Sequence, residues 1–304
     1  MRFALGQCSL LVLFVCSCAQ FSQVAADAAS ISGAKAMEYV QAQVAFGPRP
    51  PGSSALQQCR EYISGQLRGW GYQIDEDAFD ADTPYGSIRM VNLIAHKVAG
   101  SSGVIAFATH YDTKYMGDKN FVGANDAGSS TALVMELARV LASHKDGLDY
   151  WFVFLDGEEA FIQWSTFDST YGSRHLARRW KQEGTASKVK ALILLDMIGD
   201  RDLDIFKETN STPWLMNLFW DTARNIGLQG ILSNIVSDVQ DDHIPFIDVG
   251  IPSVDIIDLN YGPGNSYHHT LQDTLDKVSP DSMEKVGKAV LAMLPQLQKK
   301  LGGK

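Results

Sequence analysis

The feature that most constrains the fold of this sequence is a series of short apolar runs that alternate with helical patterns. The runs cover Val104–Thr109, Tyr150–Leu155, Ala191–Leu195 and Ser253–Ile257. Continuous apolar character over four to eight residues is typical of a strand that is buried on both faces of a sheet. Helical patterns stand between these runs, at residues 129–142, 171–183 and 213–226. This alternation predicts an α/β fold with a largely parallel sheet.

The remaining segments fit the same fold. Further helical patterns cover residues 32–45, 53–70 and 280–301, and two further strands are expected at 72–79 and 88–98. No internal repeat, linker or shift in composition divides the 304 residues, and 45% of them are hydrophobic, which is enough for a full core. We therefore predict a single α/β domain, with a central mixed, mostly parallel β-sheet flanked by helices on both faces.

The first residues predict export. Arg2 precedes an apolar run, Cys8–Cys16, that is too short to span a bilayer. Small residues at 24–26 then favour a signal peptide over residues 1–26, with the catalytic domain at 27–304. Alternatively, residues 15–18 resemble a lipobox, and a lipoprotein leader would end before Cys18. We expect an exported protein of bacterial type that is periplasmic, secreted or lipid-anchored, with membrane attachment only if Cys18 is lipidated.

Composition excludes several classes of protein. Three of the four cysteines fall in the leader, so Cys59 has no partner for a disulfide within the domain. The formal net charge is −9 and no block of Lys or Arg occurs, so we expect no nucleic-acid partner. A Gly-x-Ser-x-Gly nucleophile motif is absent from the sequence, which argues against a serine hydrolase. We expect a monomer.

Each central strand finishes in polar residues that can bind a metal. A single carboxylate after a strand is usually a helix cap or a solvated turn. Ligands of open α/β sheets bind at the carboxyl ends of the strands, however, and four strands that end alike predict one shared cleft. The strand ends carry His110 and Asp112, then Asp156, Glu158 and Glu159, then Asp196, and then Asp255, while nearby loops add Asn125–Asp126 and His268–His269.

The mixture of residue types points to zinc. Carboxylates that converge in one cleft repel each other unless a cation neutralises them. Imidazole and carboxylate together suit zinc, whereas calcium and magnesium prefer oxygen ligands alone. Glu158 and Glu159 are adjacent, and neighbouring side chains at a strand end point to opposite sides. One of the two can therefore bind the metal while the other acts as a general acid and base.

Several longer motifs give the chain a family resemblance. They are His-Tyr-Asp-Thr-Lys-Tyr at 110–115, Phe-Val-Gly-Ala-Asn-Asp at 121–126, Asp-Gly-Glu-Glu-Ala-Phe at 156–161, Tyr-Gly-Ser-Arg-His-Leu-Ala at 171–177 and Asp-Asp-His-Ile-Pro-Phe at 241–246. With these motifs the sequence resembles the animal-type glutaminyl-peptide cyclotransferases, which are related in fold to the zinc aminopeptidases. The resemblance spans most of the chain after the leader.

The resemblance implies a function and a set of roles. Such an enzyme converts the N-terminal glutamine of peptides or proteins to pyroglutamate with release of ammonia, and it contains one zinc ion per chain. The matching positions are Asp126, Glu159 and His269 as zinc ligands, Glu158 as general acid and base, Asp196 and Asp241 as hydrogen-bonded aspartates beside the reacting centre, and Trp164 as an aromatic residue of the substrate pocket.

Two positions depart from the vertebrate pattern. His268 stands where those members have Trp, and Asp255 stands where they have His. We expect both residues in or behind the substrate pocket, where they would alter its shape and specificity without affecting the metal.

Two alternatives share these residues. In a zinc aminopeptidase of the same fold, His110 and Asp196 would complete a second metal site with Asp126 as the bridge, and Glu158 would activate a metal-bound water. A non-catalytic relative would lack Glu158 or a metal ligand, and all of these residues are present. Trp164 and the motif at 171–177 favour the cyclase.

Overall fold

The structure is a computed structural model in which residues 31–97, 103–144 and 147–302 are described. The predicted signal peptide over residues 1–26, with its alternative end before Cys18, lies outside these ranges. Among the helices of the described ranges, none combines the length and the apolar character that crossing a bilayer requires.

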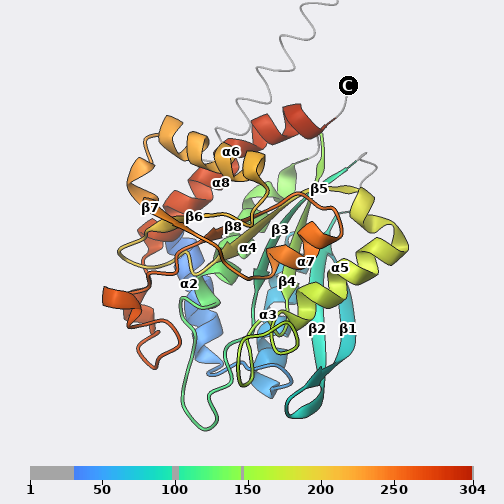
Figure 1. Ribbon diagram of the computed structural model, residues 1–304, viewed down its shortest axis with the longest axis vertical. Coiled ribbons are helices and arrows are strands. Elements are labelled where there is room, and N and C mark those ends of the chain that lie inside the picture. Colours follow the sequence, from blue (N-terminus) through green and yellow to red (C-terminus); the bar gives the residue numbers. More distant parts are fainter. Residues whose placement is uncertain (1–30, 98–102, 145–146, 303–304) are drawn as a thin grey trace, which may run out of the picture.

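Six strands form the central sheet, in the order β1-β2-β4-β3-β5-β8 (Figure 1). Their bounds are Gln73–Thr83 for β1, Gly86–His96 for β2, Val104–His110 for β3, Asp149–Leu155 for β4, Val189–Asp196 for β5 and Ser253–Ile257 for β8. The strands β4, β3, β5 and β8 run parallel to one another. All four are buried along most or all of their length, as their apolar sequences predicted.

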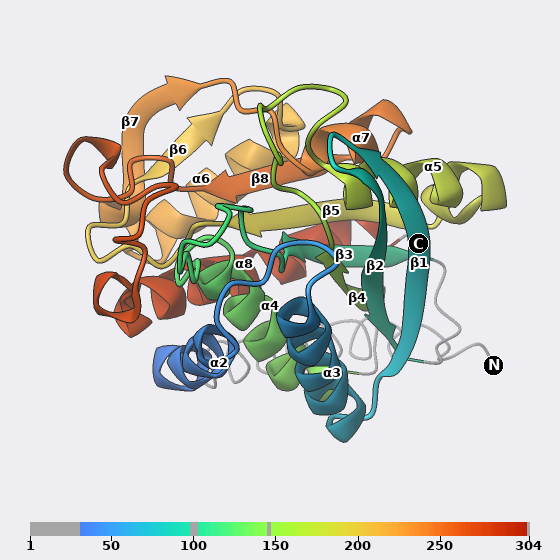
Figure 2. The same ribbon diagram turned by 90° about the horizontal axis from the view of Figure 1, so that it is seen from below.

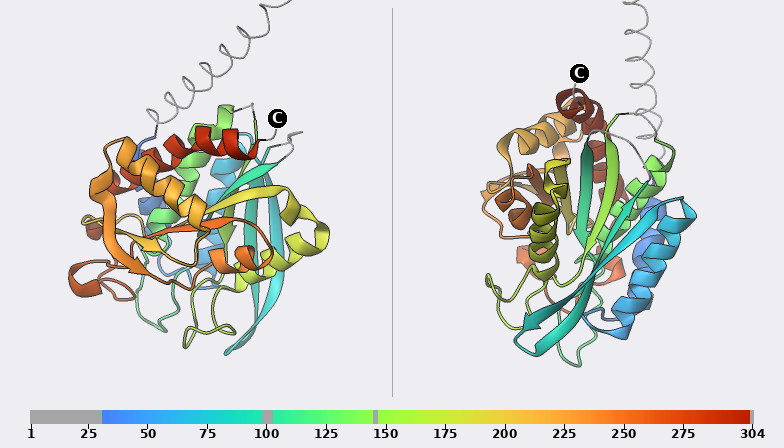
Figure 3. Two further views of the ribbon diagram at one scale, coloured as in Figure 1. Left: turned by 45° about the horizontal axis from the view of Figure 1, so that its top comes forward. Right: turned by 90° about the vertical axis from the view of Figure 1, so that its right-hand side faces the viewer.

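The sheet is mixed, as predicted, but it is not mostly parallel. Of the five neighbouring pairs three are parallel, while β1–β2 and β2–β4 are antiparallel. A tight turn between Thr83 and Gly86 joins β1 to β2. So short a connection makes a hairpin, since a parallel pair needs a crossover of a dozen or more residues. In Figure 3 this hairpin is tilted relative to the central strands, as the twist of a sheet requires.

Helices cover both faces of the sheet, as predicted. The longer helices are α2 (Gly33–Ala45), α3 (Ser54–Gly69), α4 (Gly128–Val140), α5 (Tyr171–Glu183), α6 (Pro213–Asn225) and α8 (Pro280–Leu301). Figure 2 shows α2, α3 and α4 on one side of the sheet, and α5 with the short helix α7 (His243–Asp248) on the other. Ser32, Ser53 and Ser279 cap three of these helices, because each side chain accepts a backbone N–H from the first turn.

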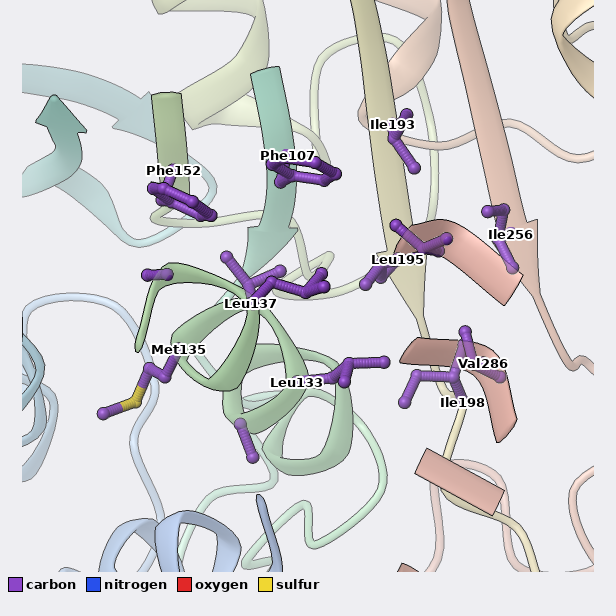
Figure 4. Packing of buried hydrophobic residues seen from close by; sticks show 14 of the residues in the cluster. Phe107, Leu133, Met135, Leu137, Phe152, Ile193, Leu195, Ile198, Ile256 and Val286 are labelled. Atoms are coloured by element: carbon purple, nitrogen blue, oxygen red, sulfur yellow. The ribbon is translucent and has the colours of Figure 1, made fainter. Parts of the chain in front are cut away.

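The main core lies between the sheet and α4. Phe107, Phe152 and Leu195 of the strands pack against Leu133 and Leu137 of this helix, and all five are fully buried (Figure 4). Each such side chain contributes about 1.5–3 kcal/mol by leaving water. The second face has its own cluster around Trp180 and Phe246, from α5 and α7. The strand ends that carry the polar residues are thus fixed by packing on both faces.

Three elements were not predicted. They are α7 and a separate two-stranded parallel sheet that is formed by β6 (Ile205–Glu208) and β7 (Leu232–Ser237). Both strands are short, β6 ends in Lys207 and Glu208, and half of the residues of β7 are exposed, so neither has the long apolar run that identifies the central strands. Helix α7 contains only six residues, including Pro245.

Candidate functional site

The polar strand ends and their loops converge on one pocket of about 260 Å³. The segments after β3 and β4 leave the sheet at the same edge (Figure 1). The pocket is lined by Asp126, Glu158, Glu159, Trp164, Asp196, Asp241, His268 and His269 among the predicted site residues, and by apolar side chains such as Met197, Ile257 and Leu259. The structure therefore brings together all predicted site residues except His110 and Asp255.

The side chain of His269 joins two carboxylates of this pocket. Its Nε2 lies 3.3 Å from Asp126 Oδ2 and 2.9 Å from Glu159 Oε1. His268 lies beside it, with the ring centroids 4.0 Å apart, and Asp126, His268 and His269 each offer a donor atom within 4.8 Å of the others. Three segments that are remote in sequence thus supply the donors.

Below the pocket, His110 contacts the opposite side of Asp126. His110 Nε2 lies 3.3 Å from Asp126 Oδ1 and 3.2 Å from Asp196 Oδ1, and the imidazole is 2% exposed. The donor atoms of His110, Asp126 and Asp196 form a second group within 4.8 Å. Asp126 therefore stands between two imidazoles, one open to the pocket and one buried.

The charge balance of the pocket fits a cation. Asp126 Oδ2 and Glu159 Oε1 are buried and, apart from their ion pairs with His269, have no hydrogen-bond partner among the described residues. Burial opposes a charge on His269, yet Glu159 and Asp126 raise the pKa of the imidazole to about 10. Burial also opposes a charge on His110, but Glu158 and hydrogen bonds to Asp112, Asp126 and Asp196 raise its pKa well above the usual value. The negative charge of these carboxylates stabilises the protonated form of both imidazoles. A divalent cation bound between the carboxylates would neutralise the same charge.

Glu158 is a buried carboxylic acid of the same pocket. It lines the pocket, is 6% exposed, and lies beside Glu159 without contacting His269. Burial raises the pKa of Glu158 well above its usual value; the nearby His110 lowers it, and the charges of Glu159, Asp241 and Asp242 raise it further. A carboxylate of raised pKa takes up a proton readily and can return it near neutral pH.

Asp241 lines the pocket, whereas Asp255 lies behind it. Burial and the charge of Asp196 raise the pKa of Asp241 to about 7. Asp255 is fully buried and its Oδ2 lies 3.9 Å from His243 Nδ1, while His243 Nε2 lies 3.2 Å from Glu208 Oε2. Since no part of Asp255 reaches the pocket surface, the residue cannot touch a substrate there.

Three residues to which the sequence assigned no role of their own hold the site in place. The carboxylate of Asp112 accepts the backbone N–H groups of Glu158 and Glu159, at 3.1 and 3.4 Å. Asp273 accepts those of Asn125 and Asp126, at 2.8 and 3.1 Å. Lys114 Nζ donates to Glu159 Oε2 at 3.1 Å, which leaves Oε1 for the pocket. Asp112 and Lys114 fall within the quoted 110–115 motif, whereas Asp273 carries no sequence signal.

The sequence is similar to that of known proteins over most of its length. Residues 92–294 match the model of peptidase family M28. The chain is 31% identical over 268 residues to a glutaminyl-peptide cyclotransferase of Drosophila melanogaster, which covers 78% of this chain and 74% of the relative. It is 32% identical over 281 residues to the one from Bothrops jararaca, with 78% and 75% covered.

Solved structures show the same similarity. A glutaminyl cyclase from an Acidobacteriales bacterium superposes with a TM-score of 0.85 at 41% identity, covering 89% of this chain and 96% of that one. A leucine aminopeptidase precursor from Bacteroides thetaiotaomicron gives 0.77 at 25% identity, with 87% and 97% covered. The fold, the family model and the identities to relatives together place this chain in peptidase family M28, among the glutaminyl-peptide cyclotransferases.

Proposed function

We propose that this enzyme is a zinc-dependent glutaminyl cyclase, which converts the N-terminal glutamine of peptides or proteins to pyroglutamate and releases ammonia. The observation that carries the proposal is the position of Glu158 in a small pocket, next to the group formed by Asp126, Glu159 and His269. The similarity to the Acidobacteriales glutaminyl cyclase supports it.

In this proposal Asp126, Glu159 and His269 hold one zinc ion per chain. When bound, zinc supplies a Lewis acid that polarises the γ-carbonyl of the substrate glutamine. Lys114 and Asp273 keep Glu159 and Asp126 oriented toward His269. The apolar side chains of Met197, Ile257 and Leu259 exclude water from the same pocket.

Glu158 carries the proton. Its carboxylate takes a proton from the α-amine as the amine nitrogen bonds to the γ-carbon and closes a five-membered ring. The bond from the γ-carbon to the amide nitrogen then breaks, and Glu158 returns the proton to this nitrogen, which leaves as ammonia. Asp196 and Asp241 line the pocket beside Glu158 and hold the amine and the departing nitrogen by hydrogen bonds. Both reacting groups belong to one residue, so positioning supplies much of the catalysis.

A second candidate is a two-metal aminopeptidase. It is favoured by the group of His110, Asp126 and Asp196, whose donor atoms lie within 4.8 Å of one another. In that enzyme Glu158 would activate a water for hydrolysis of the first peptide bond.

One experiment separates the two. The purified protein is incubated with a peptide that begins in Gln and with an amino-acid p-nitroanilide, each with and without a chelator. Loss of the mass of one ammonia without cleavage of the peptide supports the cyclase, whereas release of nitroaniline supports the peptidase. Metal analysis should find about one zinc per chain for the cyclase and about two for the peptidase.

The role of Glu158 has its own test. Glu158→Gln keeps the shape of the side chain but cannot accept a proton, so turnover should fall by about 10²–10⁴-fold or more. Zinc content should stay unchanged, because Glu159 Oε1 and not Glu158 contacts His269. Glu159→Gln is the matched control and should lose zinc. Full turnover in Glu158→Gln would contradict the assignment.

The cellular location and the oligomeric state belong to the same proposal. We propose that the protein is exported, with a leader over residues 1–26 or one that ends before Cys18, and that it acts as a monomer. Edman sequencing of the mature protein and its mass reveal which leader is removed, and light scattering gives the oligomeric state.

A further inference from the structure

A larger cavity of about 600 Å³ adjoins the catalytic pocket. The two share Trp164, Gln240 and Asp241 as lining residues. Trp164 is 37% exposed and stands at this junction. A peptide whose first residue occupies the small pocket can therefore continue into the larger cavity, which we call the outer groove.

The outer groove runs along α5. This helix starts next to the catalytic glutamate, since Thr170 N donates to Glu158 O at 2.7 Å and Tyr171 N donates to Gly157 O at 2.8 Å. Helix α7 lies beside α5 and forms the other wall with Ile244 and Pro245, and Val249 extends this wall directly after the helix (Figure 1). The far end of α5 is thus further from the reacting centre than its start.

Three cations of α5 line the outer groove. They are Arg174, Arg178 and Lys181, which are spaced so that they fall on one face of the helix. Across this stretch the helix rises about 10 Å, which matches about three residues of extended peptide. Part of the hydrogen-bonding capacity of the Arg174 guanidinium is already occupied, because it donates to the backbone oxygens of Ser169 and Thr170.

The charge of these groups is not balanced by the protein. Within the described part of the chain none of the three forms an ion pair, whereas Arg179 of the same helix faces away and pairs with Asp77 at 2.9 Å. The acidic lining residues are Asp248, which is exposed, and Asp241 at the inner end. This local excess of positive charge contrasts with the formal net charge of −9 of the whole chain.

We propose that the outer groove is a binding site for acidic side chains of the substrate, in the three or so residues that follow the N-terminal glutamine. The inference rests on the proposed cyclase function and names its preferred substrates: peptides with Asp or Glu soon after the glutamine. Arg178 and Lys181 are the specificity-determining residues, since both are exposed in the groove and neither contacts the catalytic pocket.

The test uses the zinc-loaded full chain and three peptides of equal length. Each begins with Gln-Ala, followed by Asp-Glu, Asn-Gln or Lys-Lys, and a glutamine dipeptide serves as a substrate that does not reach the groove. We expect kcat/KM to be about three- to tenfold higher for the acidic peptide than for the neutral one, mainly through KM, because each exposed ion pair contributes modestly. The difference should shrink at about 1 M salt, where charges are screened.

A second part of the test reverses the charges of the groove. Arg178→Glu with Lys181→Glu should remove or invert the order of acidic and basic peptides and leave the dipeptide unchanged. Lys188→Glu with Lys299→Glu changes the net charge equally at exposed sites outside the groove, and the acidic preference should survive.

Equal kcat/KM for acidic and neutral peptides, or equal effects of the two double variants, would overturn the groove assignment. Failure to cyclise any substrate, the dipeptide included, would instead overturn the proposed function.

Discussion

At the scale of single residues, the site is dominated by buried acids whose charges are balanced only within the cluster. Asp126 lies between two imidazoles, and both imidazoles have raised pKa values because of the surrounding carboxylates. Asp112 and Asp273 are buried as well, yet their carboxylate oxygens accept hydrogen bonds from backbone N–H groups. Buried carboxylates thus serve two purposes here: some face the pocket, and others fix the loops that present them.

Asp156 is a buried carboxylic acid outside the pocket, and its protonation can be tested through the pH dependence of stability. The residue is 1% exposed, its Oδ2 accepts from Val91 N at 2.8 Å, and its Oδ1 has no hydrogen-bond partner within residues 31–97, 103–144 and 147–302. Burial and the charge of Asp112 raise its pKa to about 8, whereas in the unfolded chain it lies near about 4. Between these values the folded chain holds a proton that the unfolded chain has released, so stability falls as the pH rises from about 4 to about 8.

Asp156→Asn should remove this dependence, because the amide does not titrate. Relative to the wild type, the variant's free energy of unfolding should increase steadily between pH 5 and about 8, as measured by urea unfolding at several pH values. The exposed Asp221→Asn is the control and should run parallel to the wild type. Parallel curves for Asp156→Asn as well would contradict the assignment of the raised pKa to this residue.

The residues of the pocket were predictable to different degrees. Asp126, Glu159 and His269 were predicted from motifs, and they do meet in one pocket. Asp255 was expected in or behind the pocket, and its burial depends on His243 and Glu208, which belong to α7 and β6. Neither of these elements has a clear sequence pattern. Asp273 was missed because a single carboxylate in a loop has no signal, and its role exists only through the fold.

At the scale of elements, α5 links the catalytic loop to the sheet. Gly172 lies in its first turn, where an added Cβ would meet Asn92 Oδ1 and the backbone oxygen of Asp156 at 2.4 Å each. Asn92 belongs to β2, and Asp156 follows β4. Glycine therefore lets the helix approach the strand ends closely, and this contact positions the segment that carries Glu158.

Gly172→Ala should destabilise the protein by about 1–3 kcal/mol, because backbone must move to accommodate the methyl group. It should also lower kcat/KM, since a shift of α5 moves the loop bonded to it through Tyr171 and Gly157. Gly65→Ala in α3 is the matched control: nothing lies within 4 Å of its added Cβ, so it should be stabilising by about 0.5–1 kcal/mol. Urea unfolding and kinetics on both variants provide the measurement, and equal stability would contradict the close approach.

The helices and strands were predicted correctly where their burial requires a recognisable apolar pattern. β3, β5 and β8 are mostly apolar because they are buried between helices on both faces, and α5, α8 and β8 begin and end where expected. Strand direction was the main error. The sequence predicts that β2 is a strand, but it does not predict which strands pair with it or in which direction. These follow from the hairpin with β1 and from the antiparallel pairing with β4.

At the scale of the whole molecule, the proposed metal site joins three segments that are far apart in the chain. Asp126 precedes α4, Glu159 follows β4, and His269 follows β8. The carboxylate oxygens that meet at His269 Nε2 lie in a folded arrangement that the unfolded chain lacks. A cation bound there should therefore stabilise the fold as a whole and not one loop only.

Zinc should accordingly raise the melting temperature, and a chelator should lower it. At a free zinc concentration of about 100 times Kd the gain is about 2.7 kcal/mol, which for a domain of this size corresponds to about 5 °C. His269→Ala should lose most of this response, because it removes the atom that joins Asp126 to Glu159. His96→Ala, which removes an ion pair between β2 and Asp75 of the edge strand β1, is the matched control and should keep the response. Calorimetry at fixed free zinc measures both variants, and the same zinc-dependent shift in His269→Ala as in the wild type would place the metal elsewhere.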